Sequence, residues 1–173
     1  MRAVYIAGEP ATGKTTLMLK VISRLGMGAS FEYKKVKGSY HDKTKTWVVG
    51  IYQPDVLFGG TDRLAMTVIG DAIEWLGTLS PRHRVILEGD RLANARFLNA
   101  LGDDRHLFML IASPEVKARR HKERGDTQSD RFLLSRKTKC ENLFISLPFK
   151  AQRNETAEEL ERNVDEILCA LLA

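Results

Sequence analysis

Short apolar runs alternate with amphipathic stretches along this chain. Residues 3–7, 85–88 and 106–112 are apolar, as buried parallel strands are expected to be. Hydrophobic side chains recur at helical spacing over residues 17–25, and Gly26 follows as a residue that would end that helix. Because strands alternate with helices, we expect an α/β fold, a three-layer αβα sandwich with a mostly parallel sheet.

The pattern also predicts an insertion between the first helix and the second apolar strand. Residues 31–36 and 46–52 read as two strands, and residues 37–43 read as a polar, exposed connection between them. Such a hairpin would give the sheet an antiparallel edge. A glycine-containing loop over 58–62 would then lead into a helix with one buried face, formed by Ala65, Val68, Ile69, Ala72 and Leu76.

The second half of the chain is predicted to hold the remaining helices and one short strand. A helix is expected around residues 93–101, and a basic helix over 114–124 is followed by another basic stretch to Lys139. The apolar residues 143–147 are predicted as the final strand. Thr156 and Glu159 have the spacing of a capping box, which predicts the start of a terminal helix.

Length and composition favour a single domain over residues 1–173, which is long enough to bury a full core. No apolar run approaches the roughly 20 residues that a membrane-spanning helix needs. The first predicted strand begins almost at Met1, so we expect no signal peptide and a cytoplasmic protein. Cys140 and Cys169 lie too far apart in the sequence for a metal or redox motif. The net charge of +5 fits either a phosphate-handling enzyme or a nucleic-acid partner.

Residues 8–16 carry the clearest chemical signal. They match the pattern G-x-x-x-x-G-K-[ST] of a phosphate-binding P-loop and lie between a predicted strand and a predicted helix. The glycines allow a tight loop whose amides bind phosphate, Lys14 would reach the β- and γ-phosphates, and the Thr15 hydroxyl would bind magnesium. We therefore expect ATP and Mg²⁺ as cofactors, with nucleotide contacts from Gly8, Pro10, Ala11, Thr12, Gly13, Lys14, Thr15 and Thr16.

A basic segment in the second half is a candidate for a phosphate-clamping lid. Arg120 and Arg124 are four residues apart and share one helix face, where they would bind the nucleotide and the transferring phosphoryl group. Arg131 and Arg136 extend the same region and would reach the acceptor. The alternative is a solvated basic helix with no ligand.

Two acidic residues follow the strand at 85–88. At the end of such a strand one carboxylate would hold a magnesium-bound water and its neighbour would polarise the acceptor hydroxyl. Glu88 is the metal candidate beside Thr15, and both Glu88 and Asp90 are candidates for the general base. The sequence leaves open which one is the base. In the alternative interpretation Asp90 only caps a helix and Glu88 pairs with Arg91.

Residues 59–63 form a candidate acceptor loop. Gly59 and Gly60 would allow close approach of the backbone to a ligand, and Asp62 would bind or deprotonate an acceptor hydroxyl beside Arg63. The alternative is that Thr61 or Asp62 is simply the N-cap of the following helix.

These features distinguish between classes of P-loop protein. The chain contains neither an Asn-Lys-x-Asp motif nor a D-x-x-G switch, which argues against a GTPase. The layout resembles the nucleoside monophosphate kinase group of P-loop kinases across nearly the whole chain. A regulatory module that hydrolyses nucleotide slowly is the alternative from another class.

A closer resemblance involves the P-loop together with residues 58–64, 88–92, 124–130 and 135–139. These segments resemble phage-encoded P-loop kinases of thymidine hypermodification. That resemblance implies transfer of the γ-phosphate of ATP to 5-hydroxymethyluracil in DNA, in the cytoplasm of the host cell. The alternative is a nucleoside monophosphate kinase or another small-molecule kinase.

A DNA substrate would also fit the basic and aromatic residues of the predicted hairpin. Lys35 and Lys45 would contact DNA phosphates. Tyr33, Tyr40 or Trp47 would stack on a displaced base, or these rings would simply pack the hairpin.

Overall fold

The computed structural model describes residues 1–53, 59–125 and 128–173. These residues form a seven-stranded sheet in the order β2-β3-β4-β5-β1-β6-β7. Five of its strands run parallel to one another. They are β1 (Arg2–Gly8), β4 (Thr46–Val49), β5 (Arg84–Glu88), β6 (Arg105–Ile111) and β7 (Lys150–Arg153).

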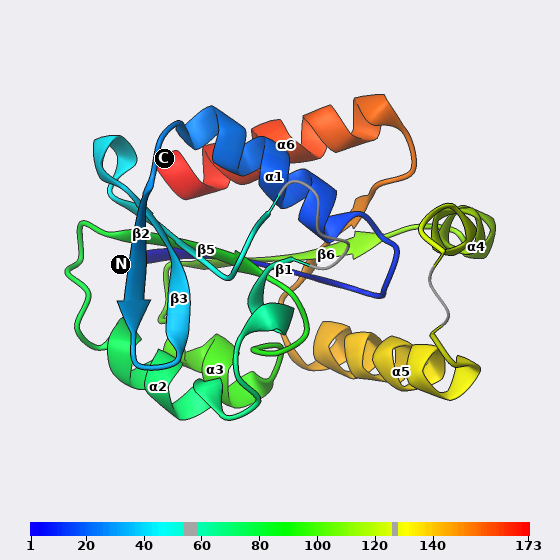
Figure 1. Cartoon of the computed structure of the whole chain (residues 1–173), viewed down its shortest axis with the longest axis horizontal. Helices are drawn as coiled ribbons and strands as arrows, with labels where there is room; N and C mark the ends of the chain where they lie inside the picture. The colour runs from blue at the N-terminus through cyan, green and yellow to red at the C-terminus, as the bar shows by residue number, and fades with distance from the viewer. Residues whose placement is uncertain (54–58, 126–127) are drawn as a thin grey trace.

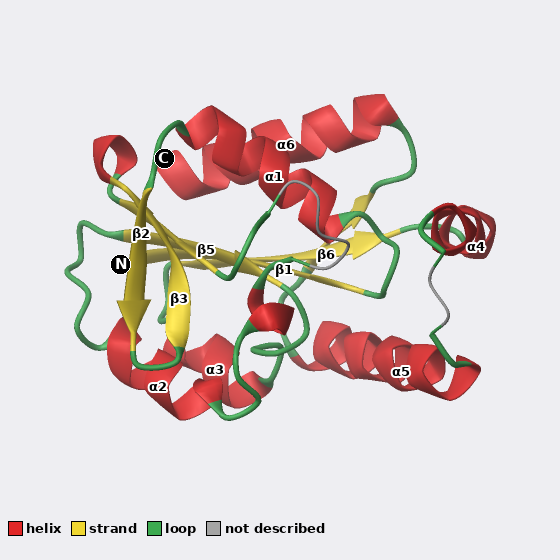
Figure 2. Cartoon of the chain, viewed as in Figure 1, coloured by secondary structure: helices red, strands yellow, loops and turns green. Residues whose placement is uncertain are grey.

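Helices cover both faces of this sheet, which confirms the predicted three-layer α/β fold (Figure 1 and Figure 2). On one face lie α1 (Lys14–Leu25) and α6 (Ala157–Leu172). The other face carries α2 (Val68–Leu76), α3 (Ala95–Ala100) and α5 (Asp130–Ser146). Helix α4 (Pro114–Glu123) lies beyond the end of β6, at the right of Figure 1. Among the described helices, none is long and apolar enough to cross a membrane.

Each face of the sheet has its own hydrophobic core. Leu17 and Val21 of α1 pack with Ile167 of α6 over one face. Trp75 of α2 and Phe97 of α3 belong to the core on the other face. Because both sides of β1 are covered, its residues 3–7 are buried without alternation, as expected for a central parallel strand.

The antiparallel edge is confirmed, but its predicted boundaries are wrong. Strand β2 (Ala29–Tyr33) pairs with β3 (Val36–His41), and β3 pairs with β4, both antiparallel. Residues predicted as the exposed connection thus form most of β3, and the turn lies at Lys34, which has a φ of 52°. The outer strands of the edge are half exposed and carry polar side chains, so they lack the apolar signal of a buried strand. A short 3₁₀ turn (Asp42–Thr44) leads into β4.

The final strand was also predicted in the wrong place. Residues 143–146 form the end of α5 and Leu147 is its C-cap; only Leu143 of these residues is buried, and Ile145 is 84% exposed. An apolar run with a single buried residue fits one helix face better than a strand covered on both sides. The last strand is β7, whose sequence Lys-Ala-Gln-Arg is polar because it lies at the sheet edge. The capping box of α6 is present as predicted.

Candidate functional site

The P-loop joins the end of β1 to the first turn of α1. Gly13 at its end has a φ of 92°, and a side chain there would meet the amide of Asn154 at 2.5 Å. Asn154 donates from Nδ2 to the Thr12 carbonyl (2.8 Å), which holds the loop from the side of β7. Thr12 itself is buried and donates to the Glu9 carbonyl (2.9 Å). The loop is therefore held both by a hydrogen bond within it, from Thr12 to Glu9, and by a hydrogen bond from Asn154.

Lys14 spans the opening of this loop. Its Nζ donates to the carbonyls of Gly8 (2.8 Å) and Glu9 (2.9 Å). These bonds place a cation and the N-terminal end of α1 at the same point, which is the arrangement that binds a polyphosphate.

Thr15 and Glu88 form a pair between α1 and β5. The Thr15 hydroxyl donates to Glu88 Oε1 over 3.2 Å, and the Glu88 residue is only 1% exposed. The pKa of Glu88 is raised to about 7, chiefly by burial and in smaller part by Asp62, although Lys14 and the Thr15 hydrogen bond lower it. A hydroxyl and a buried carboxylate are ligands suited to Mg²⁺, which would also offset the cost of burying the charge.

The protein would supply only part of a magnesium coordination shell. Within the part of the chain that the structure describes, no group of three or more His, Cys, Asp or Glu residues gathers to hold a metal. Phosphate oxygens and water commonly complete such a shell around Mg²⁺.

The paired glycines of the predicted acceptor loop approach this Thr15–Glu88 pair. Gly60 has a φ of 76°, and a side chain there would lie 2.3 Å from Glu88 Oε1. A side chain at Gly59 would lie 2.8 Å from Thr15 Cγ2. These glycines therefore allow the backbone to approach Thr15 and Glu88, the two candidate magnesium ligands. Phe58, also part of the predicted loop, lies outside the described residues.

Asp62 links two loops instead of capping α2, so the N-cap interpretation is wrong. It lies in a 3₁₀ turn (Thr61–Arg63), and α2 starts only after Thr67. Asp62 Oδ1 accepts from the backbone N–H groups of Asp90 (2.7 Å) and Arg91 (3.0 Å). The Arg91 side chain donates to the Asp62 carbonyl over 3.1 Å. The alternative pairing of Arg91 with Glu88 is not among the contacts of the described residues.

Asp90 joins α5 to the loop after β5. Its carboxylate pairs with Arg136 and with Lys139, whose Nζ lies 2.8 Å from Asp90 Oδ1. The cap of α3 is Asn94, so the alternative role of Asp90 as a helix cap is wrong.

Arg120 of α4 reaches the P-loop, and Arg124 is the C-cap residue of the same helix. Arg120 donates to the Ala11 carbonyl (3.1 Å) and to the Asn154 carbonyl (2.9 Å), which ties the P-loop to the loop before α6. Burial lowers the pKa of Arg120, and neighbouring arginines lower it further. Arg124 Nε donates to the Arg120 carbonyl over 3.3 Å.

One cavity of about 540 Å³ brings most of these groups together at the C-terminal edge of the sheet. Its P-loop half is formed by Gly8, Pro10, Ala11, Gly13, Lys14, Thr15, Thr16, Arg120, Arg124 and residues 154–157. Its acid half is formed by Gly59, Asp62, Asp90, Phe132 and Arg136, and Glu88 lies between the two halves. The predicted site residues thus include groups on both sides of a single cavity.

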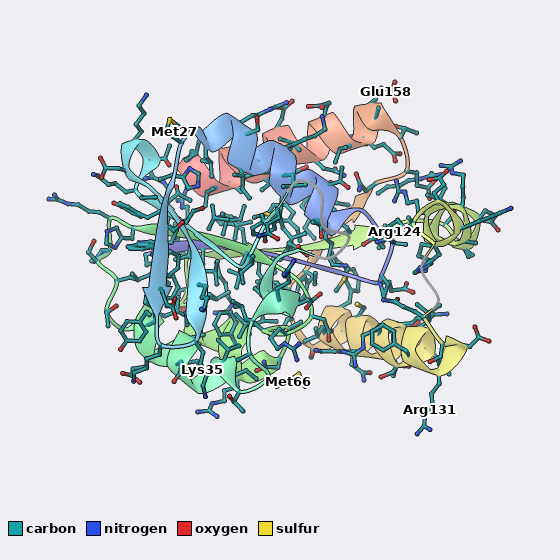
Figure 3. The ribbon with its side chains drawn as sticks, in the orientation of Figure 1. Met27, Lys35, Met66, Arg124, Arg131 and Glu158 are labelled. Atoms are coloured by element: carbon teal, nitrogen blue, oxygen red, sulfur yellow. The ribbon has the colours of Figure 1, made fainter. Side chains whose placement is uncertain are left out.

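Several predicted residues do not line it. Thr12 is buried beneath the loop and Gly60 lies behind Glu88, whereas Arg63 and Arg131 are exposed. Arg131 points away from the rest of the molecule (Figure 3). Lys35 bonds Thr67 (2.8 Å), and its place near the hairpin end is distant from Arg124 in Figure 3.

The rest of the hairpin also lies apart from the cavity. Lys45 pairs with Asp42 at the far end of β4. Trp47 packs on Tyr40 and Phe31, with ring centroids 4.2 and 4.7 Å apart, and the Tyr33 hydroxyl bonds Glu74. These aromatic rings pack the hairpin against itself and α2.

Sequence reasoning missed Gln128, Phe132 and the loop over 154–157, all of which line the cavity. The loop follows β7, and ligands in parallel α/β sheets bind beyond the carboxyl ends of the strands. The sequence hides the position of this loop, because the apolar run at 143–147 predicts the final strand there and not at β7.

A P-loop at the carboxyl edge of a parallel sheet, facing carboxylates and arginines, defines a P-loop nucleotide-binding protein of the kinase type. A family model described as P-loop Nucleotide Kinase3 matches residues 1–172, so the chain belongs to this family. The comparison with curated proteins finds no match. Family membership indicates a nucleotide kinase and leaves the acceptor unspecified.

Proposed function

We propose that the protein is an ATP- and Mg²⁺-dependent kinase that transfers the γ-phosphate to a hydroxyl group, specifically the hydroxymethyl group of 5-hydroxymethyluracil in DNA. The observation that carries the phosphotransfer proposal is the single cavity in which Lys14 and the Thr15–Glu88 pair face Asp62, Asp90 and the arginines of α4 and α5. Phosphoryl transfer depends mainly on positioning and charge stabilisation, and this cavity offers both.

The P-loop half would hold the triphosphate. Lys14 would exchange its bonds to the Gly8 and Glu9 carbonyls for the β- and γ-phosphates. Thr15 and Glu88 would hold Mg²⁺, which neutralises phosphate charge when bound. Arg120 and Arg124 would act as lid arginines on the same phosphates, since both line the cavity.

We assign the general base to Asp62. Both carboxylate oxygens of Asp90 are already engaged in ion pairs, one with Arg136 and one with Lys139. Asp62 is oriented through one oxygen by two neutral backbone amides, and it is exposed and lines the cavity. Glu88 is buried beside Thr15, where it serves the metal better than the acceptor.

The acceptor is inferred from the resemblance and from the charge of the chain. The resemblance to kinases of thymidine hypermodification and the net charge of +5 favour DNA. A target base in a duplex would have to be extruded to reach the cavity. A free nucleotide is the second candidate, because a cavity of about 540 Å³ has the size of an ordinary small-ligand site.

A panel of acceptors tests the proposal. Labelled ATP would be offered with free nucleotides and with single- and double-stranded DNAs that do or do not contain 5-hydroxymethyluracil. We expect label in the modified DNA only, and none with the Lys14→Ala variant. Label only in free nucleotides would refute the DNA acceptor and leave the kinase standing. Hydrolysis of ATP that no acceptor stimulates would contradict the kinase itself.

A further inference from the structure

Phe132 is the one aromatic side chain among the described residues that line the cavity. It lies in the first turn of α5, where its backbone N–H is bound by the capping Ser129 side chain over 3.3 Å. The residue keeps 39% of its surface exposed although it lines the cavity. A large apolar ring that stays partly open to a binding site is a candidate ligand contact.

The ring is held in place from one side. Arg136 lies one helical turn later, and its guanidinium carbon is 4.9 Å from the centre of the Phe132 ring. Arg136 also pairs with Asp90. This chain of contacts orders the ring and ties it to the acid half of the cavity.

The position of the ring favours the acceptor over ATP. In the P-loop half, Arg120 and Asn154 line the cavity and are bonded to each other and to the P-loop. Phe132 is instead connected through Arg136 and Asp90 to Asp62, whose carboxylate accepts the Asp90 amide. A planar group stacked on Phe132 would therefore belong to the molecule that presents its hydroxyl to Asp62.

We propose that Phe132 is the stacking platform for the base of the acceptor and is therefore a residue that determines acceptor specificity. The inference rests on the proposed kinase function and adds the residue that selects its acceptor. Stacking tolerates any base, because every base offers a π face. Phe132 would therefore select for an aromatic acceptor, and polar groups of the cavity would select among the bases.

The kinetic test compares Phe132→Leu with Phe132→Trp, using the acceptor that takes up label in the panel above. Phe132→Leu keeps an apolar side chain but removes the flat ring. We expect it to raise the acceptor KM by about tenfold or more, with the KM for ATP within about twofold of the wild type. Phe132→Trp should keep the acceptor KM near the wild-type value. Leu134→Ala is the matched control, since Leu134 is exposed on the same helix and does not line the cavity.

A binding test needs no turnover. Addition of the acceptor alone should quench the indole fluorescence of the Phe132→Trp variant more than it quenches that of the wild type. Addition of ATP alone should produce no such extra quenching. A rise in the KM for ATP with Phe132→Leu, or quenching by ATP, would show that the ring serves adenine and overturn the inference. An unchanged acceptor KM would also overturn it while the kinase function stands. If no acceptor takes up label, the proposed function fails first and this inference fails with it.

Discussion

The two halves of the cavity are built in different ways. The P-loop half comes mostly from one continuous segment, residues 8–16, whose backbone carbonyls accept the hydrogen bonds that hold it. The side chains of Lys14, Arg120 and Asn154 donate these bonds to the Gly8, Glu9, Ala11 and Thr12 carbonyls. The acid half is assembled from segments near residues 62, 90 and 136, and charged side chains join them. Backbone geometry suits a phosphate that never varies, whereas side-chain pairs can be changed to suit different acceptors.

This contrast predicts that the largest loss of activity comes from the P-loop half. Lys14→Ala should lower kcat by about 10³-fold or more, because it removes the cation aimed at the transferring phosphate. The thermal unfolding temperature should change little, since the lysine makes only two bonds to loop carbonyls in the free protein. Steady-state phosphotransfer and thermal melts would measure the two effects.

Lys20→Ala is the control for this variant. Lys20 lies on the same helix and pairs with Glu161 at the surface, away from the cavity. It should keep near-normal kcat. Substantial turnover by Lys14→Ala would mean that the phosphates lie elsewhere.

In the acid half, Asp62 and Asp90 should respond differently to loss of charge. Asp62→Asn should lower kcat by on the order of 10²- to 10⁴-fold with ATP affinity unchanged, as expected for a general base. Asp90→Asn should instead act mainly on the acceptor KM, because it weakens the contacts with Arg136 and Lys139 that hold α5 in place. Kinetics for both substrates separate these outcomes. A larger kcat loss for Asp90→Asn would reverse the assignment.

The same contrast explains what the sequence could predict. The P-loop half was found because its groups are close in sequence and their spacing carries the chemistry. Sequence reasoning missed Phe132 and Asn154 because their places in the cavity depend on how α5 and β7 pack beside the P-loop. The spacing of residues within a short segment carries no information on that packing. Continuous apolar runs predict the buried strands, but β3 and β7 have no such run because both carry exposed polar side chains. Strand β7 is an edge strand, and β3 lies in the antiparallel part of the sheet beside the edge strand β2.

Where the two halves meet, Glu88 should make the stability of the metal-free protein depend on pH. Its pKa rises from 4.5 to about 7 on folding, so between these values the folded state binds more protons than the unfolded state. The free energy of unfolding should therefore fall as pH rises through this window, by on the order of 3 kcal/mol. Urea titrations in EDTA would compare the wild type with Glu88→Gln, which stays neutral and should lack this component. Parallel pH curves for the two proteins would contradict the prediction.

The smallest expected effect concerns the glycine that lets the two halves approach each other. Gly60→Ala should destabilise the protein by about 1–3 kcal/mol, because its φ of 76° disfavours a side chain and the new Cβ would lie 2.3 Å from Glu88 Oε1. Gly70→Ala is the matched control: Gly70 lies within α2 with no atom within 4 Å of an added Cβ, so alanine should stabilise by about 0.5–1 kcal/mol. Urea unfolding measures both changes. If Gly60→Ala were as stable as the wild type, the Glu88 side chain would be free to move away from the new Cβ. The close contact between Gly60 and Glu88 would then not be what fixes the carboxylate beside Thr15.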